Sequence, residues 1–207
     1  TITPATGLDL EITNYSGVYD SASHSIVVTN TVDGDVVSYS TDGRETWSEI
    51  NPAYTNVGNY AVDVKVENPN YADRTISGTV VITPAEVVVT ANNKTKIFGA
   101  VDPTLTAEVT GLVGEESESL ITYSLSRIAG ENVGNYAITA TGNAIQGNYT
   151  VEFIPGTLTI TMGTGPQIGI TSYSGVYDAE PHSIAVNNTI TGDTVHYSVD
   201  DGDRKST

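Results

Sequence analysis

A long internal repeat constrains this chain more than any other feature. Residues 12–42 recur as residues 170–200, with 20 identities in 31 aligned positions. Repetition over such a length is typical of tandem arrays, in which each copy is one structural module. We therefore expect several small modules along the chain and no single large domain.

A second and weaker repeat indicates what lies between the two copies. Residues 57–61 recur as residues 133–137, and residues 78–83 resemble residues 156–161, at offsets of 76 and 78 residues. A different module with a similar second half is therefore expected between the copies. The predicted order is the tail of a preceding module at 1–8, a first β-module at 9–84, a second β-module at 85–162, a linker at 163–169 and a truncated copy of the first module at 170–207.

Both ends of the sequence suggest a segment of a longer protein. Residues 1–5 read like residues 81–85, which close the first module. The copy at 170–207 carries only the first half of its module, so it is not expected to bury a complete core alone. Two outcomes stay open for this copy: it is frayed, or it pairs with a strand of a neighbouring chain.

The charge balance argues against several kinds of partner. The 25 acidic and 8 basic residues give a net charge of −17, which repels the phosphates of nucleic acid and the surface of an anionic membrane. Direct insertion into a membrane is not expected either. Such an acidic composition suits the solubility of an extended surface protein. The chain has no cysteine, which excludes disulfides, thiolate metal sites and cysteine catalysis.

The hydrophobic pattern has a period of two. Apolar and charged residues alternate through residues 60–67, and short apolar runs recur at 25–28, 36–39, 79–82 and 157–160, separated by Gly, Asn, Asp and Pro. This pattern predicts short strands with one buried face. The fold class is therefore all-β, with tandem small immunoglobulin-like sandwiches. One alternative for the middle module is a β-grasp-like α+β arrangement, because residues 115–121 could form a helical turn with acids at its start.

Two short motifs resemble a tyrosine corner. In each, a glycine precedes a tyrosine that opens an alternating strand: Gly58 with Tyr60, and Gly134 with Tyr136. In a tyrosine corner the ring packs inward and its hydroxyl bonds to the backbone, while the glycine permits a tight approach. We expect these four residues to be structural, and the motif favours the immunoglobulin-like fold.

Residues 87–99 and 102–105 resemble the opening of the MBG repeat, a mostly-β, glycine-rich module of bacterial surface proteins, with Phe98 in place of the usual tyrosine. Residues 133–138, 148–149 and 156–160 fit the second half of that repeat. The flanking copies resemble a companion repeat of large exported proteins of Gram-positive gut bacteria. These resemblances imply an extracellular, cell-wall or cell-surface location and a stalk or adhesin role; they imply no reaction and no catalytic residues.

Residue patterns that carry chemistry are absent from the sequence. No serine-nucleophile elbow, phosphate-binding glycine loop or paired-histidine zinc motif occurs. We therefore expect no enzyme activity and no catalytic, cofactor-binding or metal-binding residues. Calcium is the one open alternative for a cofactor, since residues 33–35 and 200–203 supply carboxylates, although neither segment has the spacing of a dedicated calcium loop.

Residues 40–47 resemble an Asp-box, a hairpin turn in which an aspartate binds backbone amides. Asp42 is expected to hold this turn, and Arg44 replaces the glycine of the pattern. Trp47, Tyr54 and Tyr71 flank turns, which makes them candidate contacts for a ligand. The predicted function is a non-catalytic stalk, spacer or adhesin segment. The alternatives are a module that binds a host or cell-surface carbohydrate or protein, and an accessory region of a large extracellular enzyme.

Overall fold

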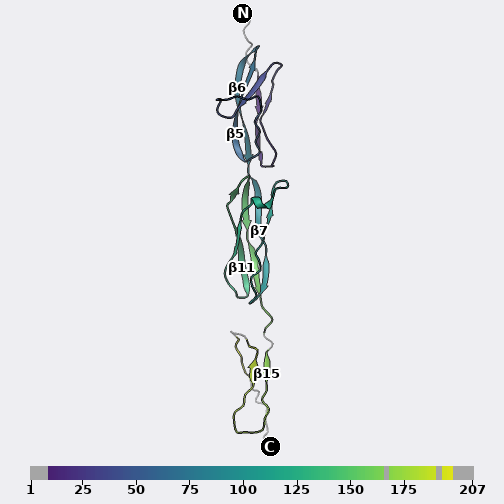
Figure 1. The fold of residues 1–207 in the computed structure, drawn as a ribbon, viewed down its shortest axis with the longest axis vertical. Coiled ribbons are helices and arrows are strands. Elements are labelled where there is room, and N and C mark those ends of the chain that lie inside the picture. Colours follow the sequence, from purple (N-terminus) through teal and green to yellow (C-terminus); the bar gives the residue numbers. More distant parts are fainter. Residues whose placement is uncertain (1–8, 166–167, 190–192, 198–207) are drawn as a thin grey trace. The chain divides into compact units, whose positions relative to one another are not determined.

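The computed structural model describes residues 9–165, 168–189 and 193–197, and nearly all of its regular structure is β (Figure 1). The chain divides into two compact units, one ending at Thr161 and one beginning at Met162. The first unit holds two modules, which we call module 1 (residues 9–83) and module 2 (residues 85–161). The second unit is described separately below.

Module 1 consists of two sheets. A four-stranded sheet has the order β2-β6-β5-β4, and a two-stranded sheet pairs β1 with β3. The pairing of β2 with β6 is parallel, whereas the other pairs in module 1 are antiparallel. The strands are β1 (Glu11–Thr13), β2 (Tyr15–Val18), β3 (Val27–Thr29), β4 (Val36–Ser40), β5 (Gly58–Asn68) and β6 (Tyr71–Thr83).

The long hairpin of β5 and β6 follows from the alternation in the sequence. Val62, Val64 and Val66 are buried, while the charged residues between them are half-buried. The hairpin turns after Asn68, whose side-chain oxygen accepts a hydrogen bond from the Asn70 backbone N–H at 2.9 Å. This is an Asx-turn, which lets a short polar side chain stand in for a backbone turn.

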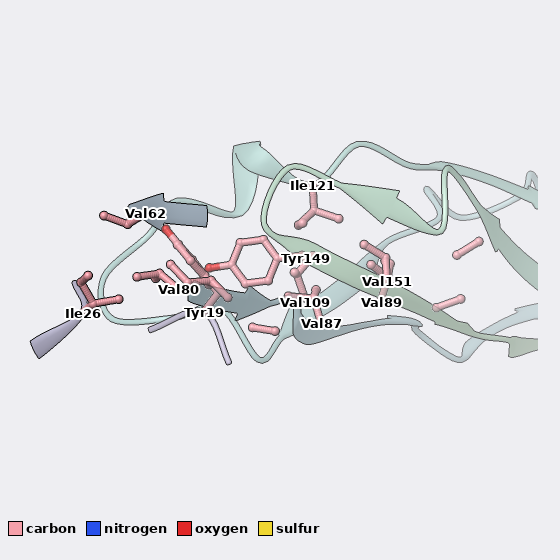
Figure 2. Packing of buried hydrophobic residues seen from close by; sticks show 14 of the residues in the cluster. Tyr19, Ile26, Val62, Val80, Val87, Val89, Val109, Ile121, Tyr149 and Val151 are labelled. Atoms are coloured by element: carbon pink, nitrogen blue, oxygen red, sulfur yellow. The ribbon is translucent and has the colours of Figure 1, made fainter. Parts of the chain in front are cut away.

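Module 2 has two four-stranded sheets, ordered β10-β11-β14-β8 and β12-β13-β7-β9. Their facing sides supply buried apolar residues, including Val87 and Val89 from one sheet and Ile138, Leu158 and Ile160 from the other. Figure 2 shows part of this packing. The strands are β7 (Ala85–Ala91), β8 (Lys94–Ile97), β9 (Ala107–Thr110), β10 (Ser124–Arg127), β11 (Gly134–Thr141), β12 (Ile145–Gln146), β13 (Tyr149–Ile154) and β14 (Gly156–Thr161).

The expectation of tandem all-β sandwiches is confirmed, and the β-grasp alternative for the middle module is wrong. The helical turn near residue 117 is only a 3₁₀ helix of three residues, η1 (Glu118–Leu120), capped by the Ser117 side chain. None of its residues is buried, because this polar stretch lacks an apolar stripe. The module is closed by a second sheet instead of a helix.

One four-stranded sheet has the same strand arrangement in both modules, since β2-β6-β5-β4 corresponds to β8-β14-β11-β10. β2 runs parallel to the end of β6, with Tyr15 opposite Val80, and β8 runs parallel to β14, with Lys94 opposite Leu158. The Tyr19 N–H donates to the Thr83 carbonyl at 2.8 Å, and the Phe98 N–H donates to the Thr161 carbonyl at the same distance. The weak repeat in the sequence therefore reflects equivalent strands.

The second unit contains β15 (Gly169–Thr171) and β16 (Ala185–Asn187) among its described residues. They pair antiparallel, with Ile170 opposite Val186. The register matches that of β1 and β3, in which Ile12 lies opposite Val28. The described part of this unit thus reproduces the small sheet of module 1.

Candidate functional site

The junction between modules 1 and 2 is held by hydrogen bonds that the sequence did not predict. Only Pro84 separates the end of β6 at Thr83 from the start of β7 at Ala85. The Ala85 N–H donates to the carbonyl of Asn148 at 3.0 Å, so the first residue after the connection is already hydrogen-bonded within module 2. Proline fixes φ, which leaves this one-residue connection little freedom.

Glu116 bonds to both modules at once. The Tyr19 hydroxyl of module 1 donates to Glu116 Oε1 at 2.5 Å, and the Tyr149 hydroxyl of module 2 donates to Glu116 Oε2. The two rings meet edge to face with centroids 5.6 Å apart, and Figure 2 shows them side by side. Edge-to-face contact suits the quadrupoles of aromatic rings. Both tyrosines are buried and Glu116 is half-buried, so the carboxylate and the two rings form a close contact across the junction.

The side chain of Asn148 makes a second set of hydrogen bonds across the junction. Its Oδ1 accepts a hydrogen bond from the Val57 backbone N–H at 2.9 Å, and its Nδ2 donates to Asn56 Oδ1 at 3.1 Å. Both acceptor and donor groups of one amide are thereby used on the loop that precedes β5. Two separate bonded points, at Glu116 and at Asn148, resist rotation better than one.

The hydrogen bonds and burial at the junction favour one protonation state for each of Glu116, Tyr19 and Tyr149. Hydrogen bonds from the hydroxyls of Tyr149 and Tyr19 lower the pKa of Glu116 below its usual range. The hydrogen bond to Glu116 raises the pKa of Tyr19, and burial raises the pKa of Tyr149. At neutral pH the carboxylate is ionised and both phenols carry their protons. The donors and acceptors are therefore matched over the whole physiological range.

A small hollow lies at this junction beside Tyr19, Glu116 and Tyr149, and its volume is about 190 Å³. Pockets that hold drug-sized ligands measure roughly 300–1,000 Å³. The junction is therefore a joint between modules and too small for a ligand of that size.

Trp47 lies at a larger hollow on module 1. The hollow measures about 370 Å³, and Trp47 is half-buried at its edge. Lys65 Nζ sits 5.2 Å from the centroid of the indole ring, in cation–π contact. The other lining residues are Tyr39, Ser40, Thr41, Thr46, Ser48, Ile50 and Pro52.

The other two candidate contact residues lie elsewhere. Tyr54 stacks on Tyr60 with centroids 3.9 Å apart, and its backbone exchanges two hydrogen bonds with His24. Tyr71 begins β6 opposite Asn68 at the tip of the hairpin. Neither tyrosine lines the hollow beside Trp47. The structure therefore does not gather the three predicted contacts into one site.

Asp42 holds the turn that precedes Trp47. Its carboxylate accepts hydrogen bonds from the Ser40 hydroxyl at 2.7 Å, from the Thr46 hydroxyl at 2.5 Å and from the Glu45 and Thr46 backbone N–H groups. These bonds, that of the Thr46 hydroxyl foremost, hold the Asp42 pKa well below its usual range. Arg44 adopts φ of 76°, the left-handed conformation that the glycine of an Asp-box would adopt without strain.

Both predicted corner tyrosines bond to the backbone four residues upstream. The Tyr60 hydroxyl donates to the Asn56 carbonyl at 3.0 Å, and the Tyr136 hydroxyl donates to the Asn132 carbonyl at 2.8 Å. A Cβ at Gly58 would lie 2.5 Å from the Tyr60 ring, so the ring needs the glycine. Gly134 has φ of 155°, a conformation that residues with a side chain rarely adopt, so this position also favours glycine. These geometries are those of a tyrosine corner.

Sequence reasoning missed a four-membered charge network in module 2. Lys96 Nζ bonds to Asp102 at 2.7 Å and to Glu131 at 2.5 Å, and Arg127 bonds to the same two carboxylates. The Lys96 side chain is only 4% exposed, because its position in β8 faces inward. The hydrogen bond from Arg127, followed by that from Lys96, lowers the Asp102 pKa to about 2. The network pins the loops that follow β8 and β10.

The calcium alternative stays a prediction. Both carboxylate oxygens of Asp35 are used inside the protein: one accepts from the Val32 N–H at 2.8 Å and the other from Asn68 Nδ2 at 2.7 Å. Within residues 9–165, 168–189 and 193–197, no group of three or more histidines and acids is placed to hold a metal ion. The predicted acidic segment at 200–203 lies outside the described residues.

Family models match most of the chain. An MBG domain of the YGX type matches residues 87–159, and a second MBG domain matches residues 5–86. The chain belongs to the MBG-domain family. The match at residues 5–86 covers the first of the two copies that resembled a companion repeat, and that separate resemblance stays a prediction. The boundary between the two MBG domains falls within three residues of Pro84, where β6 gives way to β7.

Solved structures resemble these MBG domains only distantly. The three N-terminal domains of the outer capsid protein Hoc from bacteriophage RB49 are 11% identical, with a TM-score of 0.32, over 75% of this chain and 70% of that one. The insect immune protein hemolin is 11% identical, with a TM-score of 0.34, over 73% and 46%. Bacteroides ovatus SGBP-B, solved with a mixed-linkage heptasaccharide, is 16% identical, with a TM-score of 0.26, over 70% and 43%.

At these scores the structural likenesses carry no argument about function. A search of curated proteins finds no match. In the part of the chain that the structure describes, no helix is long and apolar enough to cross a bilayer.

Proposed function

We propose that these MBG domains form a non-catalytic spacer in an extracellular surface protein, in which one domain is held at a fixed angle to the next. The observation that carries the proposal is the double hydrogen bond of Glu116, to Tyr19 of module 1 and to Tyr149 of module 2. A spacer transmits position over a distance only if its joints resist bending. A charge-assisted contact between buried rings serves that purpose.

The surroundings of the joint support a mechanical role over a chemical one. Pro84 alone connects the modules, Asn148 adds a second bonded point, and the hollow beside Glu116 is small. A reaction would require groups that a substrate can reach, whereas Tyr19 and Tyr149 are buried against each other. The joint therefore supports a structural role for the first two modules.

The finer location and partner are part of the proposal. We place the protein outside the cell, on the surface or wall of a Gram-positive bacterium, as a secreted stalk or adhesin. The acidic net charge of −17 and the absence of cysteine suit such a segment. Its partner would be a host or cell-surface glycan or protein, bound either by this segment or by other parts of the same protein.

The spacer proposal can be tested by measuring the distance between the modules. The chain has no cysteine, so spin labels can be attached at Asp73→Cys and Glu108→Cys, two exposed positions in different modules. The distance distribution measured by electron paramagnetic resonance should be narrow. It should broaden in Glu116→Leu and stay narrow in Glu115→Leu, the control at an exposed neighbour. A distribution as broad in the parent chain as in Glu116→Leu would refute a fixed joint.

A second candidate function is glycan binding at Trp47. The hollow of about 370 Å³ falls within the size range of ligand pockets, and a half-buried indole beside it offers a face on which a sugar ring can stack. Titration of the chain with host and cell-wall oligosaccharides should quench or shift Trp47 fluorescence. Trp47→Ala removes the single tryptophan, so its binding is measured by isothermal titration calorimetry, where it should be abolished, with Tyr54→Phe as the control. Binding that survives Trp47→Ala would move the site elsewhere.

A further inference from the structure

The second unit keeps the internal contacts of the first half of module 1. Tyr173 stacks on His182 with centroids 3.6 Å apart, and Tyr15 stacks on His24 with centroids 3.8 Å apart. The His182–Asp178 and His24–Asp20 contacts both measure 2.8 Å. The left-handed residues also correspond, since Ala179 and Ser21 have φ of 65° and 64°. The described part of this unit therefore has the form of an MBG half-module.

The apolar residues of this unit are exposed where their counterparts in module 1 are covered. Ile26 is 0% exposed, whereas the equivalent Ile184 is 46% exposed. Ile170 and Tyr197 are both 64% exposed, and their equivalents Ile12 and Tyr39 are partly buried. A hollow of about 500 Å³ lies over this face, lined by Ile168, Ile170, Ile184, Val186, Asp193, Thr194, Val195, His196 and Tyr197.

Module 1 shows what covers the equivalent face. β5 pairs with β4, placing Val64 opposite Tyr39, and β6 pairs in parallel with β2, placing Val80 opposite Tyr15. The backbone of β6 passes directly over the two isoleucines: a Cβ at Gly78 would lie 2.6 Å from Ile12 Cγ2 and 3.2 Å from Ile26 Cγ2. No counterpart of β5 or β6 occurs among the described residues after Thr161.

We propose that the face formed by Ile168, Ile170, Ile184, Val186, Val195 and Tyr197 binds a β-hairpin with the sequence pattern of β5 and β6. One strand pairs antiparallel beside Tyr197, and the other pairs in parallel beside residues 173–176. The second strand carries a glycine where it crosses Ile170 and Ile184. The proposal goes beyond the spacer role, because it does not depend on the joint at Glu116.

Physical chemistry favours a hairpin over a smaller or flatter occupant. The face offers alternating apolar side chains beside two strand edges, which is the arrangement that strand addition uses. In module 1 the Tyr19 N–H donates to Thr83, the last residue of β6, and the equivalent residue here is Tyr177, which is 91% exposed. An apolar small molecule would cover the side chains and leave these backbone groups unpaired. Among the positions that differ between the copies, Ser172 stands where Asn14 accepts a hydrogen bond from the Thr79 N–H.

The test uses the full chain and a synthetic peptide with the sequence of residues 57–84. Isothermal titration should give one peptide bound per chain, since the hairpin site of module 1 is already filled. Hydrogen exchange should slow at the backbone amides of residues 173–177 and 195–197. A peptide carrying Gly78→Val should bind at least about tenfold more weakly, because its side chain would collide with Ile170 and Ile184. A peptide carrying Thr75→Ser, at an exposed position, should bind like the parent peptide.

A chain carrying Ile184→Asp should also lose the peptide, because hairpin binding would bury an unpaired carboxylate. The Gly78→Val peptide keeps the test decisive if that chain variant fails to fold. Absence of binding, equal binding of the Gly78→Val peptide, or two peptides per chain would each overturn the proposal. So would a dimer of the chain that buries this face and that excess peptide does not dissociate, because the occupant would then be a second copy.

Discussion

The hydroxyl of Tyr19 lies 2.5 Å from Oε1 of Glu116, a residue 97 positions further along the chain. The same carboxylate accepts a second hydrogen bond from Tyr149. One acidic side chain on a loop of module 2 thus binds the residue that directly follows β2 in module 1. The proposed spacer function depends on this contact, which a single substitution of Glu116 removes.

Glu116→Leu should weaken the joint. It removes both acceptor oxygens and leaves the hydroxyl protons of two buried tyrosines without their acceptor, although the Tyr149 hydroxyl still accepts from the Val113 N–H. This should cost about 1–3 kcal/mol of unfolding free energy. Urea unfolding followed by far-UV circular dichroism measures the loss. Glu115→Leu is the control, because Glu115 is an exposed neighbour. Equal stability of the two variants would contradict the assignment of Glu116 to the joint.

The corner tyrosines should contribute to stability through their hydroxyls. Tyr60→Phe and Tyr136→Phe each delete the hydroxyl that donates to the backbone, shared between two carbonyls in the case of Tyr60, and keep the packed ring. Each should destabilise its module by about 0.5–1.5 kcal/mol. Tyr123→Phe, at a side chain 36% exposed, should leave the midpoint of urea unfolding unchanged. A loss in Tyr123→Phe as large as in the other two would show that the effect is not specific to the corners.

Asp42→Ala should disorder the turn before Trp47. The chain has a single tryptophan, so its fluorescence reports on this turn alone. The substitution removes the acceptor of the Ser40, Glu45 and Thr46 bonds, and we expect a red shift of the emission maximum with little change in far-UV dichroism. Glu49→Ala, at an exposed residue near the same segment, should leave the spectrum unchanged. An unaltered spectrum in Asp42→Ala would mean that the turn holds without its carboxylate.

Acid should destabilise module 2 through Asp102. Its folded pKa is lowered from 3.8 to about 2, chiefly by the hydrogen bond from Arg127. A lowered folded pKa adds stability above pH 3.8 and loses it as the pH falls towards 2. Urea midpoints measured from pH 7 to pH 2 should fall across this window, and the fall should be smaller in Asp102→Asn. Asp73→Asn is the control. An unchanged fall in Asp102→Asn would exclude this residue as its source.

Alanine substitutions at two glycines should measure the cost of backbone strain with and without an added steric clash. Gly99 and Gly111 have φ of 82° and 94°. A Cβ at Gly99 meets nothing within 4 Å, whereas a Cβ at Gly111 would lie 2.4 Å from the Glu86 carbonyl oxygen. Gly99→Ala should therefore cost about 1 kcal/mol of unfolding free energy, and Gly111→Ala roughly 2–4 kcal/mol. Equal losses in urea unfolding would indicate that the strand bearing Glu86 moves away freely.

The sequence by itself determined the local structure and the modular plan. Alternation fixed which residues of β5 face the core, because side chains in a strand point to opposite sides in turn. Gly58 and Tyr60 were enough to predict the tyrosine corner, because its hydrogen bond spans only four residues. The repeat of residues 12–42 at 170–200 located the related unit. Each of these signals is either local in the sequence or visible as direct sequence identity between two segments.

Only the tertiary structure decided the contacts that bring distant residues together. Glu116 is one acid among 25, and no spacing rule marks it as the partner of Tyr19. Lys96 is buried because its position in β8 faces inward, and it pairs with Glu131, 35 residues away. The helical turn near residue 117 stayed a single 3₁₀ turn because no apolar stripe lets it pack. Such outcomes depend on which surfaces the folded sheets bring within reach, and a pattern with a period of two does not encode them.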